Sequence, residues 1–163
     1  MAFLYPFRRG NGPSANQAPF MQAVLRGEEK ERGREARLRM QFKLLTTDQL
    51  DDVMAALIFL KTVPEIDIHR IAGVGNSFGG SLTLLAAERD STIRAVVTFA
   101  AAAGSWESSA ELRERLFTAV RKTNAAIMLI HAENDYSTAA GRALAEELER
   151  MHKPALFKNL PQK

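Results

Sequence analysis

Residues 70–87 read RIAGVGNSFGGSLTLLAA, and this stretch decides the fold. The β-rich run from Ile68 to Val74 predicts a β-strand, and the apolar residues that follow at helical spacing predict a helix. Between the two, Ser77 lies in the pattern Gly75-x-Ser77-x-Gly79. This pattern is typical of the nucleophile elbow, a sharp strand-to-helix turn that holds a serine in a strained conformation above the edge of a sheet. We therefore predict that Ser77 is a nucleophile, with a purely structural turn as the alternative.

The residues around Ser77 predict how this turn works. A Cβ at Gly75 or Gly79 is expected to collide with the neighbouring strand or helix as the chain reverses. The following helix points its N-terminus at the serine, so backbone N–H groups face a developing oxyanion, and the N–H of Phe78 is the natural first donor. A dinucleotide-binding fingerprint beginning at Gly73 fails, because its third glycine falls on Phe78.

The composition limits the class of protein. A chain of 163 residues suits a single domain over residues 1–163, and its hydrophobic content of 46% is ordinary for a soluble protein. The net charge of +3 is too small to indicate nucleic acid. The longest apolar run, Val53 to Leu60, is far short of the ~20 residues that a membrane span needs. The absence of cysteine excludes disulfides and fits the cytoplasm, which is the expected location.

Strands and helices are expected to alternate along most of the chain. This order predicts an α/β fold with three layers, α/β/α, around a mostly parallel sheet. Residues 15–45 are polar and mixed in charge, so they are either a cap or a solvated, mobile excursion. Thr46 or Thr47 is expected to cap the helix that follows. The expected strands are Ala2–Phe7, the strand before Ser77, Ile93–Phe99, Ala125–Ile130 and Pro154–Leu160.

A second group of polar residues follows one of these strands. The sequence His131-Ala132-Glu133-Asn134-Asp135 comes after the buried strand that ends at Ile130. Parallel strands deliver their carboxyl ends to one edge of the sheet, so Asp135 is expected at the same edge as Ser77. We predict that Asp135 orients a catalytic histidine, with a helix N-cap as the alternative and Glu133 as the fallback acid.

Together these residues resemble the α/β-hydrolase superfamily, in its dienelactone hydrolase and prolyl oligopeptidase-like branch. The resemblance implies a partial α/β-hydrolase fold. It also implies hydrolysis of small carboxylic esters, lactones or related acyl compounds through an acyl-enzyme on Ser77, without a cofactor. The alternatives are a prolyl oligopeptidase-like serine peptidase and a non-catalytic pseudo-hydrolase that binds a ligand or partner. The matching segments are Phe7–Gly12, Asp51-Asp52, Asp67-x-x-Arg70-Ile71 with the elbow, and residues 131–135.

The three histidines raise the question of the base. His69 precedes the strand of the elbow, and His152 follows a helix of ~14 residues that returns the chain to the same, amino edge. His131 lies at the carboxyl edge and is the remaining candidate base, although the resemblance implies a structural role for it. Three dispersed histidines offer no close ligand pair for a metal. The resemblance places the catalytic histidine beyond the last strand.

We therefore expect a fragment that lacks the base, the first strands and one oxyanion donor, with weak or no turnover. Missing strands leave an exposed sheet edge, which is a route to homo-oligomers. Three further side chains are candidates for lining a substrate site. Arg8 and Arg9 could bind a substrate carboxylate or pin their loop, and Trp106 could line an acyl or leaving-group pocket or pack over the sheet.

Overall fold

The computed structural model describes residues 2–161. The chain forms two compact units, Met1–Ile66 and Asp67–Lys163, and each is described here by itself. The expectation of one domain over residues 1–163 stays a prediction. No helix in the described part of the chain is long and apolar enough to cross a membrane.

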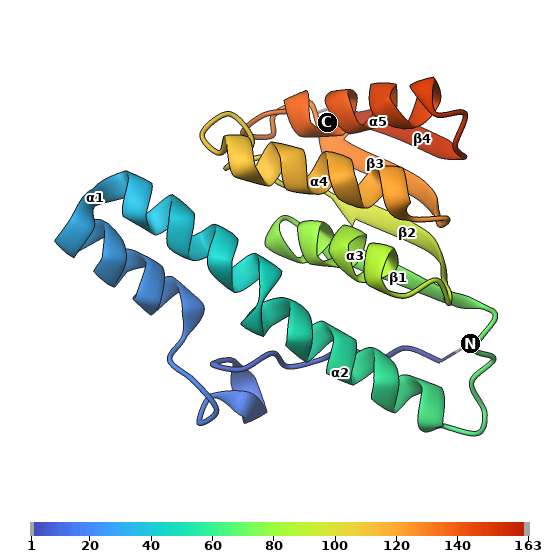
Figure 1. Ribbon diagram of the computed structural model, residues 1–163, viewed down its shortest axis with the longest axis horizontal. Helices are drawn as coiled ribbons and strands as arrows, with labels where there is room; N and C mark the ends of the chain where they lie inside the picture. The colour runs from blue at the N-terminus through green and yellow to red at the C-terminus, as the bar shows by residue number, and fades with distance from the viewer. Residues whose placement is uncertain (1, 162–163) are drawn as a thin grey trace. The chain divides into compact units, whose positions relative to one another are not determined.

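The second unit is built on a parallel four-stranded sheet, which confirms the α/β fold class. The strands follow one another in space as they do along the chain, and a helix connects each pair (Figure 1). The sequence of elements is β1 (Ile71–Asn76), α3 (Phe78–Arg89), β2 (Ile93–Phe99), α4 (Ala110–Lys122), β3 (Ala126–Ala132), α5 (Ala139–Arg150) and β4 (Ala155–Leu160).

The three helices of this unit cover one face of the sheet. Connections between successive parallel strands are right-handed, so strands added in one direction place every helix on the same side. On that face Val96, Leu129 and His131 are buried. On the opposite face Val74 is 61% exposed and Leu156 is 48% exposed. This unit therefore contributes two of the three expected layers, one of helices and one of strands.

The strand register brings the carboxyl ends together at one edge. Asn76 at the end of β1 pairs with Phe99 of β2, which pairs with Ile130 of β3. Ser77 and Asp135 therefore follow the carboxyl ends of β1 and β3, with the end of β2 between them. Neighbouring strands lie about 4.8 Å apart, so the ends of β1 and β3 are separated by about 10 Å.

The first unit is helical, and the expected strand Ala2–Phe7 is wrong. Residues 2–7 form no regular secondary structure. A strand needs a neighbouring strand to bond, and the described residues of this unit include none. The ring of Phe7 instead packs on the turn at Gly12, where an added Cβ would lie 2.5 Å from it. The elements that follow are a 3₁₀ turn (Gly12–Ser14), α1 (Met21–Thr46) and α2 (Asp48–Thr62).

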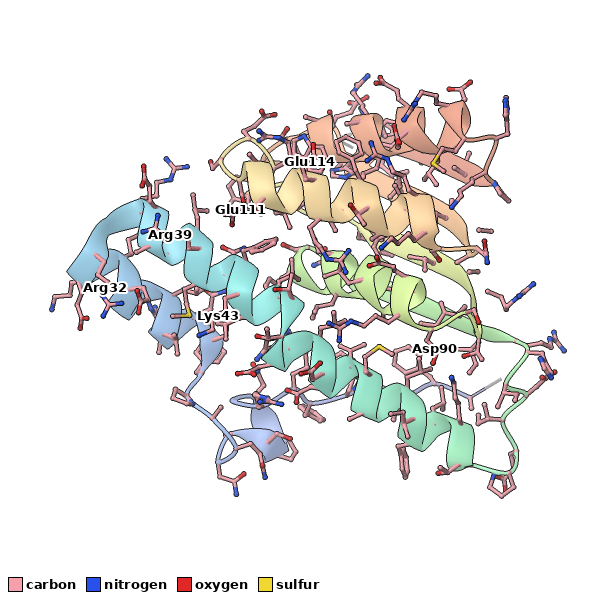
Figure 2. The ribbon with its side chains drawn as sticks, viewed as in Figure 1. Arg32, Arg39, Lys43, Asp90, Glu111 and Glu114 are labelled. Carbon is pink, nitrogen blue, oxygen red and sulfur yellow. The ribbon has the colours of Figure 1, made fainter. Side chains whose placement is uncertain are left out.

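Residues 15–45, expected as a cap or a mobile excursion, lie mostly in α1. The helix kinks at Gly33, whose φ of 81° and ψ of 176° are non-helical. Figure 2 shows Arg32 and Arg39 on the two arms of α1. Nη1 of Arg32 lies 3.6 Å from Oε2 of Glu28, and Nη1 of Arg39 lies 3.5 Å from Oε2 of Glu35. Both are ion pairs between residues four apart in the helix. A role as a cap stays a prediction.

Thr47 occupies the N-cap position of α2, as predicted, but its side chain makes no cap hydrogen bond there. The hydroxyl groups of Thr46 and Thr47 donate backwards, to the carbonyl oxygens of Phe42 at 3.0 Å and Lys43 at 2.7 Å. These hydroxyl groups therefore bond carbonyl oxygens in the last turns of α1, a local pattern that often accompanies a bend between helices.

Candidate active site

Ser77 occupies the turn between β1 and α3 in a strained conformation. Its φ of 51° and ψ of −115° lie in a region that residues with a side chain rarely adopt. The backbone is held on both sides: its N–H donates to the carbonyl oxygen of Phe99 at 2.7 Å, and its carbonyl oxygen accepts from the N–H of Ser81 at 3.2 Å. The side chain of Ser77 is exposed. The hydroxyl is therefore presented to solvent on a fixed backbone.

The glycines beside Ser77 differ in what they permit. An added Cβ at Gly75 would lie 2.2 Å from the carbonyl oxygen of Gly79, so the expected collision is present there. At Gly79 an added Cβ would meet no atom within 4 Å among the described residues, so the expected collision there is wrong. The close contact is made by Gly80 instead, where a Cβ would lie 3.0 Å from the Cβ of Ala101. Gly79 occupies a helical position at the start of α3 that tolerates a side chain.

Phe78 is the first residue of α3, directly after Ser77. The backbone N–H groups of the first helical turn, and the positive end of the helix dipole, therefore lie next to the serine. The structure places Phe78 where the sequence predicted an oxyanion donor, and its role stays a proposal.

The segment after β2 forms the middle of this edge. Ala100 has a φ of 52°, and its N–H donates to the carbonyl oxygen of Ile130 at 2.8 Å. Ala101, Ala102 and Ala103 are all buried, so these small side chains fill the interior of the unit. Ala100 alone of this group lines the pocket described below.

Asp135 lies in the loop after β3, and both of its carboxylate oxygens accept hydrogen bonds. Oδ1 accepts from the N–H of Tyr136 at 2.8 Å, and Oδ2 lies 3.1 Å from Nδ1 of His131. The side chain is 10% exposed. Ser137 rather than Asp135 bonds the start of α5, since its hydroxyl accepts from the N–H of Ala139 at 3.1 Å. This contact weighs against the alternative that Asp135 is a helix cap. Glu133, the fallback acid, is exposed.

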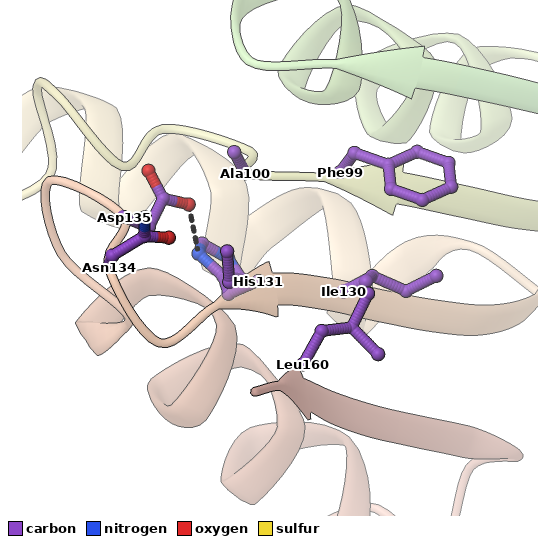
Figure 3. Close-up of a pocket in the computed structure, with 8 residues that line it drawn as sticks. Phe99, Ala100, Ile130, His131, Asn134, Asp135 and Leu160 are labelled. Atoms are coloured by element: carbon purple, nitrogen blue, oxygen red, sulfur yellow. Dashed lines mark hydrogen bonds and ion pairs between the residues drawn. The ribbon is translucent and has the colours of Figure 1, made fainter. Parts of the chain in front are cut away.

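Asp135 and Ala100 face a pocket of about 340 Å³ at the carboxyl edge (Figure 3). The pocket lies over the ends of β2, β3 and β4, and most of its lining is apolar. Asp135 and His131 are the two residues of its lining that have an ionisable side chain. The lining residues are Phe99, Ala100, Ile130, His131, Ala132, Asn134, Asp135 and Leu160.

The histidines lie as the sequence predicted, with two of them far from Ser77. His69 precedes β1 and His152 precedes β4, so both lie at the amino edge of the parallel sheet. His131 lies at the carboxyl edge but is fully buried, on the face of the sheet that α5 covers. Its Nε2 is buried and has no hydrogen-bond partner among the described residues.

The arginine loop of the first unit is pinned by carboxylate and amide groups. Arg9 donates to Asp52 from Nε at 3.0 Å, from its guanidinium at 2.7 Å and from its backbone N–H at 2.8 Å. The hydrogen bond to Asp52 raises the pKa of Arg9. Burial acts to raise the pKa of Asp52, but the hydrogen bonds from Arg9 outweigh it, and the pKa lies below its usual value. Arg9 therefore pins its loop, one of the two roles that the sequence left open.

Arg8 and Trp106 were the other candidates for lining a substrate site. Arg8 donates to the side-chain oxygen of Gln49, and burial lowers its pKa. Trp106 is 4% exposed and meets Phe117 edge to face at 5.6 Å. The structure thus gives Trp106 a packing role in the second unit, and this residue does not line the pocket beside Asp135.

The sequence profile of the dienelactone hydrolase family matches residues 17–162. The chain belongs to the dienelactone hydrolase family. The match confirms the resemblance stated above, and it covers most of the chain of this family member, including Ser77 and Asp135. No curated protein matches the chain in sequence.

Solved structures show the same fold for this dienelactone hydrolase family member. It is similar to an acylaminoacyl peptidase from Pyrococcus horikoshii, with a TM-score of 0.62 and 18% identity over 80% of this chain and 26% of that one. It is similar to a puromycin-hydrolyzing peptidase from Mycobacterium tuberculosis, with a TM-score of 0.63 and 17% identity over 77% of this chain and 23% of that one. The chain thus spans about a quarter of the length of these two proteins. It has the fold of an α/β-hydrolase.

Proposed function

We propose that this chain carries the nucleophile and acid of a serine hydrolase that acts on carboxylic esters, lactones or related acyl compounds. The observation that carries the proposal is the backbone of Ser77, whose φ of 51° in a strand-to-helix turn is the conformation of a nucleophile elbow. A strained serine at the edge where Asp135 also lies is a costly arrangement, and such strain concentrates at active sites. The family match supports the same conclusion.

The proposed chemistry proceeds in two steps. Oγ of Ser77 attacks the acyl carbon while a base takes its proton, and the oxyanion that forms faces the N–H of Phe78. The bond to the leaving alcohol then breaks as the alcohol oxygen receives a proton, which leaves an ester on Ser77. Water attacks this ester and releases the carboxylic acid and the free serine. Asp135 accepts an N–H from the imidazole that serves as base and stabilises its positive charge.

None of the three histidines is placed to act as this base. His69 and His152 lie at the amino edge, and His131 is buried with Nδ1 directed at Asp135. We therefore propose weak or no turnover from this chain alone. Because disulfides are excluded by the absence of cysteine, we also propose that the protein acts in the cytoplasm.

The test is labelling of the chain with a fluorophosphonate, which leaves a phosphonyl group on a serine and releases fluoride. We expect slow labelling at Ser77 of the native chain, mapped by mass spectrometry. Added imidazole supplies a base, and we expect it to raise the rate on the order of tenfold or more. Ser77→Ala should abolish the label. Ser91→Ala, which changes an exposed serine at the amino edge, should leave it intact.

The outcomes separate the proposal from its alternative. Labelling that survives in Ser77→Ala or in heat-denatured chain would contradict a nucleophile at Ser77. A folded chain whose Ser77 stays unlabelled with imidazole present would also contradict it, and would favour a non-catalytic pseudo-hydrolase that binds a ligand or partner.

A serine peptidase is the second candidate, because the similar solved structures are described as peptidases. Peptidases and esterases form the same acyl-serine, so the leaving group distinguishes them. An ester and an amide that share one acyl group should be compared in the presence of imidazole. We expect release from the ester only, and comparable release from the amide would favour the peptidase.

A further inference from the structure

The proposed chemistry makes no use of His131, yet this residue is one of the most deeply buried in the second unit. Its side chain is fully buried, and Nδ1 lies 3.1 Å from Oδ2 of Asp135 (Figure 3). Burial of a polar side chain costs free energy unless the side chain is hydrogen-bonded. The question is what the contact does for Asp135.

The imidazole is enclosed by α5 and β4. An added Cβ at Gly141 of α5 would lie 2.6 Å from Cδ2 of His131 and 2.8 Å from Nε2, so the helix approaches the ring as closely as glycine allows. On another side the ring of Phe157 lies 6.2 Å from the imidazole, centre to centre, at 51°. The guanidinium of Arg142 stacks over Phe157 at 5.8 Å. These contacts leave His131 little freedom to rotate away from Asp135.

The hydrogen bonds assign the position of the imidazole proton. An ionised carboxylate oxygen only accepts, so Nδ1 of His131 must carry the hydrogen and donate it to Oδ2 of Asp135. Nε2 is buried with no partner among the described residues, so a hydrogen on Nε2 would be an unpaired buried donor on a charged ring. The geometry therefore places a hydrogen on Nδ1 and none on Nε2.

This donor fixes the direction of the carboxylate. The N–H of Tyr136 bonds one oxygen of Asp135 and His131 bonds the other, so rotation of the carboxylate would break one bond or both. Each oxygen keeps a second lone pair. The side chain is 10% exposed and lines the pocket, so a remaining lone pair is accessible from it.

We propose that His131 is a positioning residue: it donates from Nδ1 to Asp135 and holds that carboxylate ready to accept an N–H from an imidazole in the neighbouring pocket. The use of Asp135 in catalysis rests on the proposed function. The placement of Asp135 by His131 does not, and it can be tested without turnover.

Two variants of His131 separate donation from packing. His131→Asn keeps a donor nitrogen close to the position of Nδ1, whereas His131→Leu fills similar space with no donor. The probe is imidazole itself, titrated into the chain while the amide signals of Ala100, Ala132 and Asp135 are followed by NMR. We expect His131→Asn to bind imidazole within about twofold of the parent chain, and His131→Leu to bind it at least about tenfold more weakly.

The same experiment has outcomes that overturn the proposal. If imidazole does not bind near Asp135 in the parent chain, or binds His131→Leu as tightly as the parent, His131 does not prepare the carboxylate. A purely structural residue would alter the melting temperature of both variants and leave the affinity of the folded molecules unchanged. Nitrogen-15 NMR of the parent chain gives a check that needs no variant, since hydrogen on Nε2 instead of Nδ1 would contradict the proposal.

A Ser77→Ala background keeps this test apart from the proposed function. The imidazole titration should be unchanged in Ser77→Ala, because no covalent step is involved. If Ser77 proves unreactive while the His131 variants behave as expected, the proposed hydrolysis fails and the positioning of Asp135 stands.

Discussion

Gly75 lies directly against the carbonyl oxygen of Gly79: a Cβ built on Gly75 would stand 2.2 Å from that oxygen and 2.5 Å from Oγ1 of Thr83. The first turn of α3 thus folds back over the end of β1 with room for a hydrogen only. We predict that Gly75→Ala lowers the free energy of unfolding by about 1–3 kcal/mol, the range for overfilling a packed site. Urea denaturation followed by circular dichroism measures this change.

The matched control is Gly79→Ala, two helical positions from the same serine. An added methyl there meets nothing within 4 Å among the described residues, and alanine favours a helix over glycine. We expect this variant to be as stable as the parent chain or up to about 1 kcal/mol more stable. Equal losses in the two variants would contradict the close approach at Gly75.

Arg9 and Asp52 carry the second prediction, which concerns the first unit. The guanidinium of Arg9 reaches both carboxylate oxygens of Asp52, at distances between 2.7 and 3.0 Å. A lysine keeps the charge but not the fork of donors. We predict that Arg9→Lys lowers the free energy of unfolding by about 1–2 kcal/mol, since hydrogen bonds to charged groups contribute at that level. Thermal unfolding followed by helix content measures it.

Arg39→Lys serves as the control in the same unit. Arg39 is paired with Glu35, whose side chain is 90% exposed, and pairs of this kind contribute little. We expect a change within about 0.5 kcal/mol. If Arg9→Lys is as mild as Arg39→Lys, the contact with Asp52 does not pin the loop.

The edge of the sheet carries the third prediction. β4 ends the strand order among the described residues, and Leu156 and Leu160 on its uncovered face are 48% and 46% exposed. An edge strand with exposed apolar residues is a template for pairing with a second chain. We predict that the chain self-associates as its concentration rises, and that Leu156→Lys shifts it toward monomer in sedimentation experiments.

Met151→Lys adds the same charge at an exposed apolar residue after α5, outside the sheet. It should leave the self-association of the parent chain unchanged. A parent chain that sediments as a monomer at every concentration would contradict the prediction.

Local patterns predicted most of the second unit. The strand Ile93–Phe99 begins and ends as expected, because it is rich in β-branched residues and buried on the helix side. The same reasoning failed for Ala2–Phe7. Its composition favours a strand, but a strand also needs a neighbour to bond, and composition does not say whether one is present.

Other features of the site depend on contacts between residues that are distant in sequence, and these could not be predicted. His131 and Asp135 are four residues apart and could be grouped from the sequence, whereas the contact of His131 with Gly141 depends on how α5 lies over β3. The sequence signal for this contact is Gly141, a glycine in the first turn of α5. Gly79 shows the opposite error. The sequence motif suggested a steric collision at this position, but a side chain there meets no atom within 4 Å among the described residues, whereas one at Gly75 would collide.

Glu147 on α5 carries the last prediction, a dependence of stability on pH. Its side chain is buried and accepts from Arg150 at 2.6 Å and from Nε of Arg121, on α4, at 2.5 Å. The hydrogen bonds from Arg150 and then Arg121 lower the pKa of Glu147. A carboxyl whose pKa is lower in the folded state stabilises the fold above its unfolded pKa, about 4.3, and loses that contribution as the pH falls through the folded value.

We therefore predict that Glu147→Gln lowers the urea midpoint at about pH 7, and that its difference from the parent chain shrinks as the pH is taken down to about 3. The amide of glutamine can still accept a hydrogen bond but has no charge to lose. The difference in urea midpoint therefore shrinks because the parent chain becomes less stable as the pH falls. Glu146→Gln, the neighbouring exposed residue on the same helix, should show no such dependence. A gap between Glu147→Gln and the parent that stays constant over this range would mean that the two arginines contribute packing across α4 and α5 rather than charge.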